Sequence, residues 1–351
     1  MNDCIFEFPI SSSCIFCENN EIWFTHSQMP LLMHANLDKK VVDFIKLIPY
    51  EKYAGIFLFR GIFVTDEEVI LIPGTSNKIV IYSKKNDDFK FIYIKSEYTE
   101  MFRGYIQEGE WLYFKPSSYS KIVRLNYVTK EIQYGINWKI FVGNNCNIDG
   151  ACKYKNEIIY SLYRTNSLLK YDICNNKLCK VEINNLKEIN QLVVWNDYIY
   201  TYNMADKFLY KLNANTMNIV QKVKLDFKAI WMNIFNNCIY LSPIDKPIWM
   251  ILNLDLKCIY KAECKNSWKW GGSQYNCFEW SCGKNGQIVA IDSRNNLIKV
   301  IDDKICISEL KIDIDLEYTL KLIMDKYMTE PIIEGFNCHL SDLIKKVLVN
   351  C

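Results

Sequence analysis

The stretch IYSLYRTNSLLKYD at residues 159–172 contains the pattern on which the fold prediction depends. It begins with an apolar pair, Ile159-Tyr160, passes through a polar turn, and returns as a second apolar segment that ends at Asp172. A short polar side chain at such a point accepts hydrogen bonds from the backbone just ahead of it and opens a tight turn. We therefore expect two antiparallel strands here, with a third strand after Asp172.

This pattern recurs seven times along the chain. The apolar pairs are Ile22-Trp23, Ile70-Leu71, Leu112-Tyr113, Ile159-Tyr160, Ile199-Tyr200, Ile239-Tyr240 and Ile288-Val289. The turn residues that follow them are Asn36, Ser83, Asn126, Asp172, Asn213, Asn253 and Asp302. With another short strand before each pair, a repeat of roughly 40 to 49 residues is typical of a four-stranded propeller blade. The sequence predicts an all-β fold over residues 1–313, a seven-bladed β-propeller of antiparallel blades. A β-sandwich or irregular barrel is the alternative.

The pattern changes beyond Ile312. Apolar residues recur at helical spacing in two runs, Leu316, Leu320, Ile323 and Tyr327, then Leu340, Leu343, Ile344 and Val347. The sequence therefore predicts a C-terminal helical extension, residues 314–351, that packs on the propeller. A detached tail that binds a partner is the alternative.

Composition limits the classes of function. The chain has 351 residues and a formal net charge of +2, so no strong overall field attracts nucleic acid or an anionic membrane. No run of about 18 apolar residues and no secretory leader is apparent. The 15 cysteines are odd in number and lack framework spacing, so we expect free thiols and a cytoplasmic protein. No cofactor and no metal site is predicted.

The residues Glu21-Ile22-Trp23-Phe24-Thr25, followed by Leu37-Asp38, resemble a blade of a large propeller group. That group includes virginiamycin B lyase and the SMP-30-like and NHL-type proteins. The resemblance covers the strand pattern alone, so it implies the fold and transfers no site residue.

Candidate ligand-binding residues stand at the starts of the expected innermost strands. Phe59-Arg60-Gly61-Ile62 and Phe102-Arg103-Gly104-Tyr105 repeat one tetrapeptide, and Ile148-Asp149-Gly150-Ala151 keeps its form with the opposite charge. We expect these positions to open onto a central channel, where arginines would bind a carboxylate or phosphate. Later blades add Gln191, Asn233, Trp270, Tyr275 and Glu279. The alternative is an internal lattice in which the arginines bond Asp149 or neighbouring carbonyl groups.

Catalytic motifs are weak. His26 lies where a blade loop should reach the channel mouth, and either His26 or Glu279 could act as the base of an enzyme. Cys14-Ile15-Phe16-Cys17 has the spacing of a zinc or redox pair, but no second ligand pair accompanies it.

Three functions remain open. The first is a non-catalytic module that binds a polar, possibly anionic, small molecule, glycan, peptide or protein at the channel mouth. The second is a lyase or lactonase that acts on a carboxylate-bearing substrate. The third is an assembly scaffold that uses the C-terminal helices.

Overall fold

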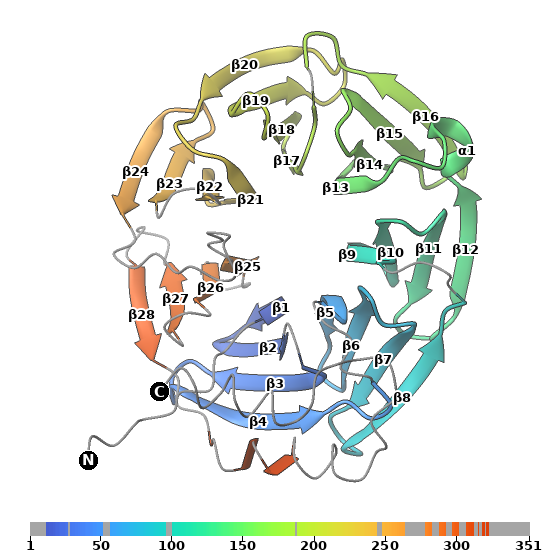
Figure 1. Ribbon diagram of the computed structural model, residues 1–351, viewed down its shortest axis with the longest axis vertical. Coiled ribbons are helices and arrows are strands. Elements are labelled where there is room, and N and C mark those ends of the chain that lie inside the picture. Colours follow the sequence, from blue (N-terminus) through green and yellow to red (C-terminus); the bar gives the residue numbers. More distant parts are fainter. Residues whose placement is uncertain are drawn as a thin grey trace, which may run out of the picture.

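In a computed structural model, the described residues are 12–26, 29–51, 57–95, 100–186, 188–243, 248–263, 278–282, 288–292, 297–301, 307–311, 315, 318–319 and 321–322. Within these residues, 28 strands form seven four-stranded antiparallel sheets. Each sheet contains four strands that are consecutive in the chain and bonded in chain order. The sheets are arranged around a common axis as a β-propeller (Figure 1).

The first sheet contains β1 (Ser12–Glu18), β2 (Glu21–His26), β3 (Leu31–Asn36) and β4 (Val41–Leu47), and the second contains β5 (Phe59–Val64), β6 (Glu68–Pro73), β7 (Lys78–Ser83) and β8 (Asp88–Tyr93). The third sheet contains β9 (Phe102–Glu108), β10 (Trp111–Pro116), β11 (Lys121–Asn126) and β12 (Ile132–Asn137). The fourth contains β13 (Ile148–Tyr154), β14 (Glu157–Leu162), β15 (Ser167–Asp172) and β16 (Lys177–Glu182). The fifth sheet contains β17 (Leu192–Trp195), β18 (Tyr198–Asn203), β19 (Phe208–Asn213) and β20 (Ile219–Lys224). The sixth contains β21 (Ala229–Phe235), β22 (Cys238–Pro243), β23 (Ile248–Asn253) and β24 (Cys258–Glu263). The seventh contains β25 (Phe278–Cys282), β26 (Ile288–Asp292), β27 (Leu297–Ile301) and β28 (Ile307–Lys311).

The apolar pairs and turn residues of the sequence repeat occupy equivalent places in the sheets. Every apolar pair lies on the second strand of its sheet, from Ile22-Trp23 on β2 to Ile288-Val289 on β26. The six turn residues in the described part end the third strands, and each accepts backbone N–H bonds from the turn that follows. Asn213 Oδ1, for example, accepts from Asn215 N and Thr216 N at 3.0 Å each. The turn chemistry inferred from the repeat is thus present in the fold.

Apolar side chains fill the space between neighbouring sheets. On β10, Phe114 packs toward the second sheet with Ile72 and Phe102, whereas the adjacent Tyr113 packs toward the fourth sheet with Tyr160. This alternation follows from the two-residue period of a strand. Burial of each large side chain contributes about 1.5 to 3 kcal/mol, so the interfaces between sheets hold the ring together.

The first and last sheets are neighbours, because β1 contacts both β5 and β25. Each of the described sheets consists of its own four consecutive strands, so no strand is exchanged at this junction within the described residues. The sequence alone did not show how the ring closes.

The predicted fold class needs correction in its helical part. Among the described residues, the helix with defined bounds is α1 (Lys139–Val142), which joins the third and fourth sheets where no helix was predicted. Tyr318, Thr319, Lys321 and Leu322, in the expected extension, are also helical. It follows Trp138, a fully buried side chain whose indole N–H donates to Tyr119 O at 2.7 Å. In the expected extension, Asp315 accepts from Thr319 N at 3.1 Å, as in one helical turn. The rest of residues 314–351 lies mostly outside the described residues, so that domain boundary stays a prediction.

No helix among the described residues is long and apolar enough to cross a membrane. Eight described cysteines form no disulfide, and Cys14 and Cys17 are both buried on β1. The described residues contain no cluster of three or more side chains suited to hold a metal ion.

Candidate functional site: a row of charged residues on the innermost strands

Three of the predicted residues, Arg60, Arg103 and Asp149, lie near the beginning of their strands, where the pairing with the next strand is irregular. The register of β5 with β6 shifts between Phe59 and Gly61, around Arg60. The pairing of β9 with β10 shifts beyond Phe102, next to Arg103, and that of β13 with β14 shifts after Ile148, next to Asp149. A bulge inserts an extra residue into one strand and redirects its side chain. Since β9 contacts both β5 and β13, these side chains come from adjacent sheets (Figure 1).

A continuous set of charge-assisted hydrogen bonds connects these residues. Arg60 Nη2 donates to Glu100 Oε1 at 3.2 Å, and Arg103 donates to Glu100 Oε2 through Nε at 3.0 Å and Nη2 at 2.9 Å. Arg103 Nη1 donates to Asp149 Oδ1 at 2.8 Å, and Asn190 Nδ2 donates to Asp149 Oδ2 at 3.3 Å. We call these five residues the arginine row. It links the second, third, fourth and fifth sheets.

The carboxylate that both arginines share lies outside the repeated tetrapeptides. It is Glu100, which accepts from Arg60 and from Arg103. The Ser117 hydroxyl also donates to Glu100 Oε2 at 2.7 Å. The internal lattice considered as an alternative therefore exists.

The row is only partly closed to solvent. The exposed fractions of the side chains are 26% for Arg60, 23% for Glu100, 33% for Arg103 and 18% for Asp149. A guanidinium group has five N–H donors, and the bonds of Arg103 in the row use three of them. Arg60 stacks on Phe57 with its guanidinium carbon 3.6 Å from the ring centroid, and its buried Nε has no partner among the described residues. Donors thus remain for a further acceptor.

Contacts within the row favour the charged forms of Glu100 and Arg103. Burial acts to raise the pKa of Glu100, but Arg103, the Ser117 hydroxyl and Arg60 outweigh it, and the net pKa is lowered. Burial acts to lower the pKa of Arg103, whereas Glu100 and Asp149 raise it, and the net pKa is raised. Glu100 is therefore ionised and Arg103 protonated at neutral pH.

Two glycines let the inner strands approach one another. A Cβ on Gly150 would lie 2.8 Å from Asn190 O and 2.8 Å from Gln191 Cα, so the fourth and fifth sheets meet backbone to backbone. Gly104 has φ +111, a conformation that other residues rarely adopt. The Arg-Gly and Asp-Gly pairs of the sequence thus combine a redirected charge with close approach of the strands.

The later predicted residues occupy different positions. Gln191 directly precedes β17, and its Oε1 accepts from Met232 N at 2.9 Å, which joins the fifth and sixth sheets. Asn233 was predicted at a strand start, but it lies inside β21, paired with Tyr240, and its Oδ1 accepts from Ile234 N. Its position differs because β21 begins earlier, at Ala229.

The remaining predicted residues are not assembled into a site. Trp270 and Tyr275 lie outside the described residues, and Glu279 lies on β25, where no side chain is described. His26 is buried at the end of β2, and its Nδ1 accepts from Met29 N at 3.1 Å. A role as catalytic base for His26 or Glu279 stays a prediction.

Sequence reasoning missed Glu100, Asn190 and Lys115. Glu100 and Asn190 precede their strands rather than belong to the repeated tetrapeptides, so the repeat gave no reason to select them. The sequence did contain a feature that could have identified Lys115. It occupies a strand position directly before Pro116, where the second sheet has Ile72 before Pro73, and a lysine in such an apolar strand is unusual.

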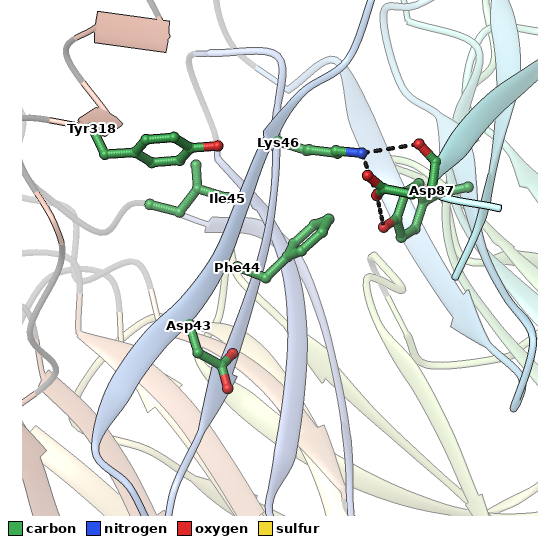
Figure 2. Close-up of a pocket in the computed structure, with 7 residues that line it drawn as sticks. Asp43, Phe44, Ile45, Lys46, Asp87 and Tyr318 are labelled. Atoms are coloured by element: carbon green, nitrogen blue, oxygen red, sulfur yellow. Dashed lines mark hydrogen bonds and ion pairs between the residues drawn. The ribbon is translucent and has the colours of Figure 1, made fainter. Parts of the chain in front are cut away.

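A separate cavity of about 500 Å³ lies at the outer edge of the ring, away from the row. Its lining includes Phe44, Tyr82, Tyr318 and an ion pair of Lys46 with Asp87 (Figure 2). Lys46 Nζ also donates to Asp87 O at 2.9 Å, and Tyr82 OH donates to Asp87 Oδ1 at 2.5 Å. Both ends of the Lys46–Asp87 pair already have partners, so we place the candidate site at the row.

Comparison with known proteins supports the fold alone. No protein-family profile matches the chain, and no curated sequence matches it. Virginiamycin B lyase from Staphylococcus aureus is 12% identical with a TM-score of 0.58, over 73% of this chain and 85% of that one. BamB from Moraxella catarrhalis is 12% identical with a TM-score of 0.54, over 82% of each chain. The protein U3-55K is 8% identical with a TM-score of 0.60, over 82% of this chain and 89% of that one. At these identities the likeness establishes only the β-propeller fold, which a lyase shares with BamB and U3-55K.

Proposed function

We propose that this protein is a non-catalytic recognition module whose arginine row binds a small polar ligand through an anionic carboxylate or phosphate group. The observation that carries the proposal is the state of Arg103. Glu100 and Asp149 hold its guanidinium group from two sides, yet two of its five N–H donors have no bond in the row. A guanidinium group fixed in this way is preorganised for a further oxygen acceptor.

Arg60 supports the same function. Its stacking on Phe57 orients the guanidinium plane, and its buried Nε has no partner among the described residues. The two arginines and two carboxylates cancel in formal charge. Recognition would therefore depend on the positions of donors rather than on long-range attraction, in keeping with a net charge of only +2.

Isothermal titration calorimetry tests this proposal with sugar acids, short dicarboxylates and sugar phosphates. We expect at least one anion to bind the parent protein, and Arg103→Gln to weaken it about tenfold or more, because a charge-assisted bond contributes about 1.5 to 3 kcal/mol.

Arg164→Gln is the matched control. It removes the same charge from an exposed arginine that stacks on Tyr163 with its guanidinium carbon 5.0 Å from the ring centroid, and it should leave affinity unchanged. A parent protein that binds none of these anions, or equal losses in both variants, would refute the proposal.

A further inference from the structure

Lys115 is partly exposed, and it differs from the three buried lysines of the described chain in having no acceptor. Lys78 donates to Tyr50 O at 2.7 Å, Lys139 to Asn144 O at 3.3 Å and Lys211 to Leu254 O at 3.0 Å. Neither a hydrogen bond nor an ion pair joins Lys115 Nζ to any residue that the structure describes. No acceptor in the described part of the chain therefore holds this amine, and the partial exposure of the side chain leaves it accessible to a small molecule.

The amine lies beside the arginine row. Lys115 is on β10, and its Cε and Nζ lie 3.7 Å and 3.8 Å from the place where a Cβ on Gly104 would stand. Gly104 directly follows Arg103 on the innermost strand β9. The end of the Lys115 side chain thus lies next to Gly104, one residue from the arginine that we propose binds the anion.

Burial also changes the acid–base behaviour of this lysine. Removal of the amine from water lowers the pKa of Lys115, and the Cys152 thiol opposes this shift only in part. A lysine with a lowered pKa is more often neutral near pH 7, and the neutral amine is the nucleophilic form.

We propose that Lys115 forms a reversible imine with a small aldehyde or 2-oxo acid that reaches the arginine row. This rests on the proposed function, since the row would hold the carboxylate of such a ligand. The lone pair on Nζ attacks the carbonyl carbon, and a proton passes from nitrogen to oxygen to give a carbinolamine. Loss of one water molecule then forms the C=N bond. The step needs no oxidant or reductant, and water reverses it.

Reductive trapping provides the test. The protein is incubated with glyoxylate, or with propanal as a probe without charge, together with sodium cyanoborohydride, and modified lysines are mapped by peptide mass spectrometry. We expect Lys115 to be modified faster than the exposed lysines by both probes. Lys115→Met should lose this adduct while exposed Lys90 is labelled as in the parent. Thermal melting shows whether the variant is folded.

The two proposals fail in different ways. Modification that follows surface exposure alone, with no preference for Lys115, would overturn the imine. Modification of Lys115 by propanal that is as fast as modification by glyoxylate, and unaffected by Arg103→Gln, would retain the imine and refute the anion site. Destabilisation of Lys115→Met does not block the test, because the labelling pattern of the parent protein decides it.

Discussion

A double-mutant cycle on Arg103 and Asp149 measures how far the arginine row stabilises the fold. Arg103→Gln removes three charge-assisted bonds and leaves Glu100 and Asp149 with fewer donors. Such bonds contribute about 1.5 to 3 kcal/mol each when buried, and exposed ion pairs contribute at most about 1 kcal/mol. Because the Arg103 side chain is 33% exposed, we expect a total loss of about 1 to 3 kcal/mol.

The coupling between the two residues is the decisive quantity. Asp149→Asn keeps the size of the side chain and its contact with Asn190, but it removes the charge that faces Arg103 Nη1. Urea unfolding of the parent, both single variants and the double variant should give a coupling free energy of about 0.5 to 1.5 kcal/mol.

Lys170→Gln provides the comparison for this cycle. It breaks the Lys170–Glu157 ion pair between β14 and β15, which shares no partner with Arg103, so its effect should add to that of Arg103→Gln within about 0.5 kcal/mol. Zero coupling between Arg103 and Asp149, or equal coupling in both cycles, would show that the row does not act as a connected unit.

Three further predictions concern the row and the repeat. Glu100→Gln should lower the urea midpoint at pH 7 and make the midpoint fall less steeply toward acid pH. Folding lowers the pKa of Glu100, so its contribution to stability is present above the unfolded pKa of about 4.3 and is lost as pH falls through the folded pKa. Midpoints that change with pH in parallel for the variant and the parent would contradict this. Gly150→Ala should lower the free energy of unfolding in urea by about 1 to 3 kcal/mol or more, because its Cβ would meet backbone atoms beside the fifth sheet. The control Gly109→Asn should change the midpoint little, because Gly109 has φ +55 and no atom lies within 4 Å of a Cβ there. Asn213→Ala should cost about 1 kcal/mol because two turn N–H groups lose their acceptor, and Asn213→Asp should restore most of it; equal loss in both variants would argue against the turn bond.

The sheets could be predicted because their signals are local. An apolar pair on the second strand, followed by an Asn, Asp or Ser at the end of the third, depends only on strand periodicity and on turn chemistry over a few residues. The helical segments were harder. α1 depends on the burial of Trp138 against the Tyr119 carbonyl, a contact between residues of different segments that no local pattern indicates.

The candidate site was predictable only in part for the same reason. Arg60, Arg103 and Asp149 stood out because they repeat within a tetrapeptide, and the structure does bring them together. Glu100 joins the two arginines, yet it belongs to the connection before β9, where the repeat has no fixed residue. A carboxylate between two arginines follows from electrostatics once they are adjacent, but the adjacency itself comes from the ring.

The residues of the arginine row contribute both to the stability of the fold and to the proposed binding of an anion. Few substitutions can therefore change one property without changing the other. Arg103 holds adjacent sheets together through Glu100 and Asp149, so a substitution there weakens both the fold and the proposed ligand site. Lys115 has no hydrogen bond or ion pair among the described contacts, and its side chain is partly exposed, so loss of its amine should leave the fold intact. A substitution of Lys115 therefore tests binding without weakening the contacts between sheets. For this reason the amine beside Gly104 provides a cleaner test of a binding site against a purely structural lattice than the paired arginines do.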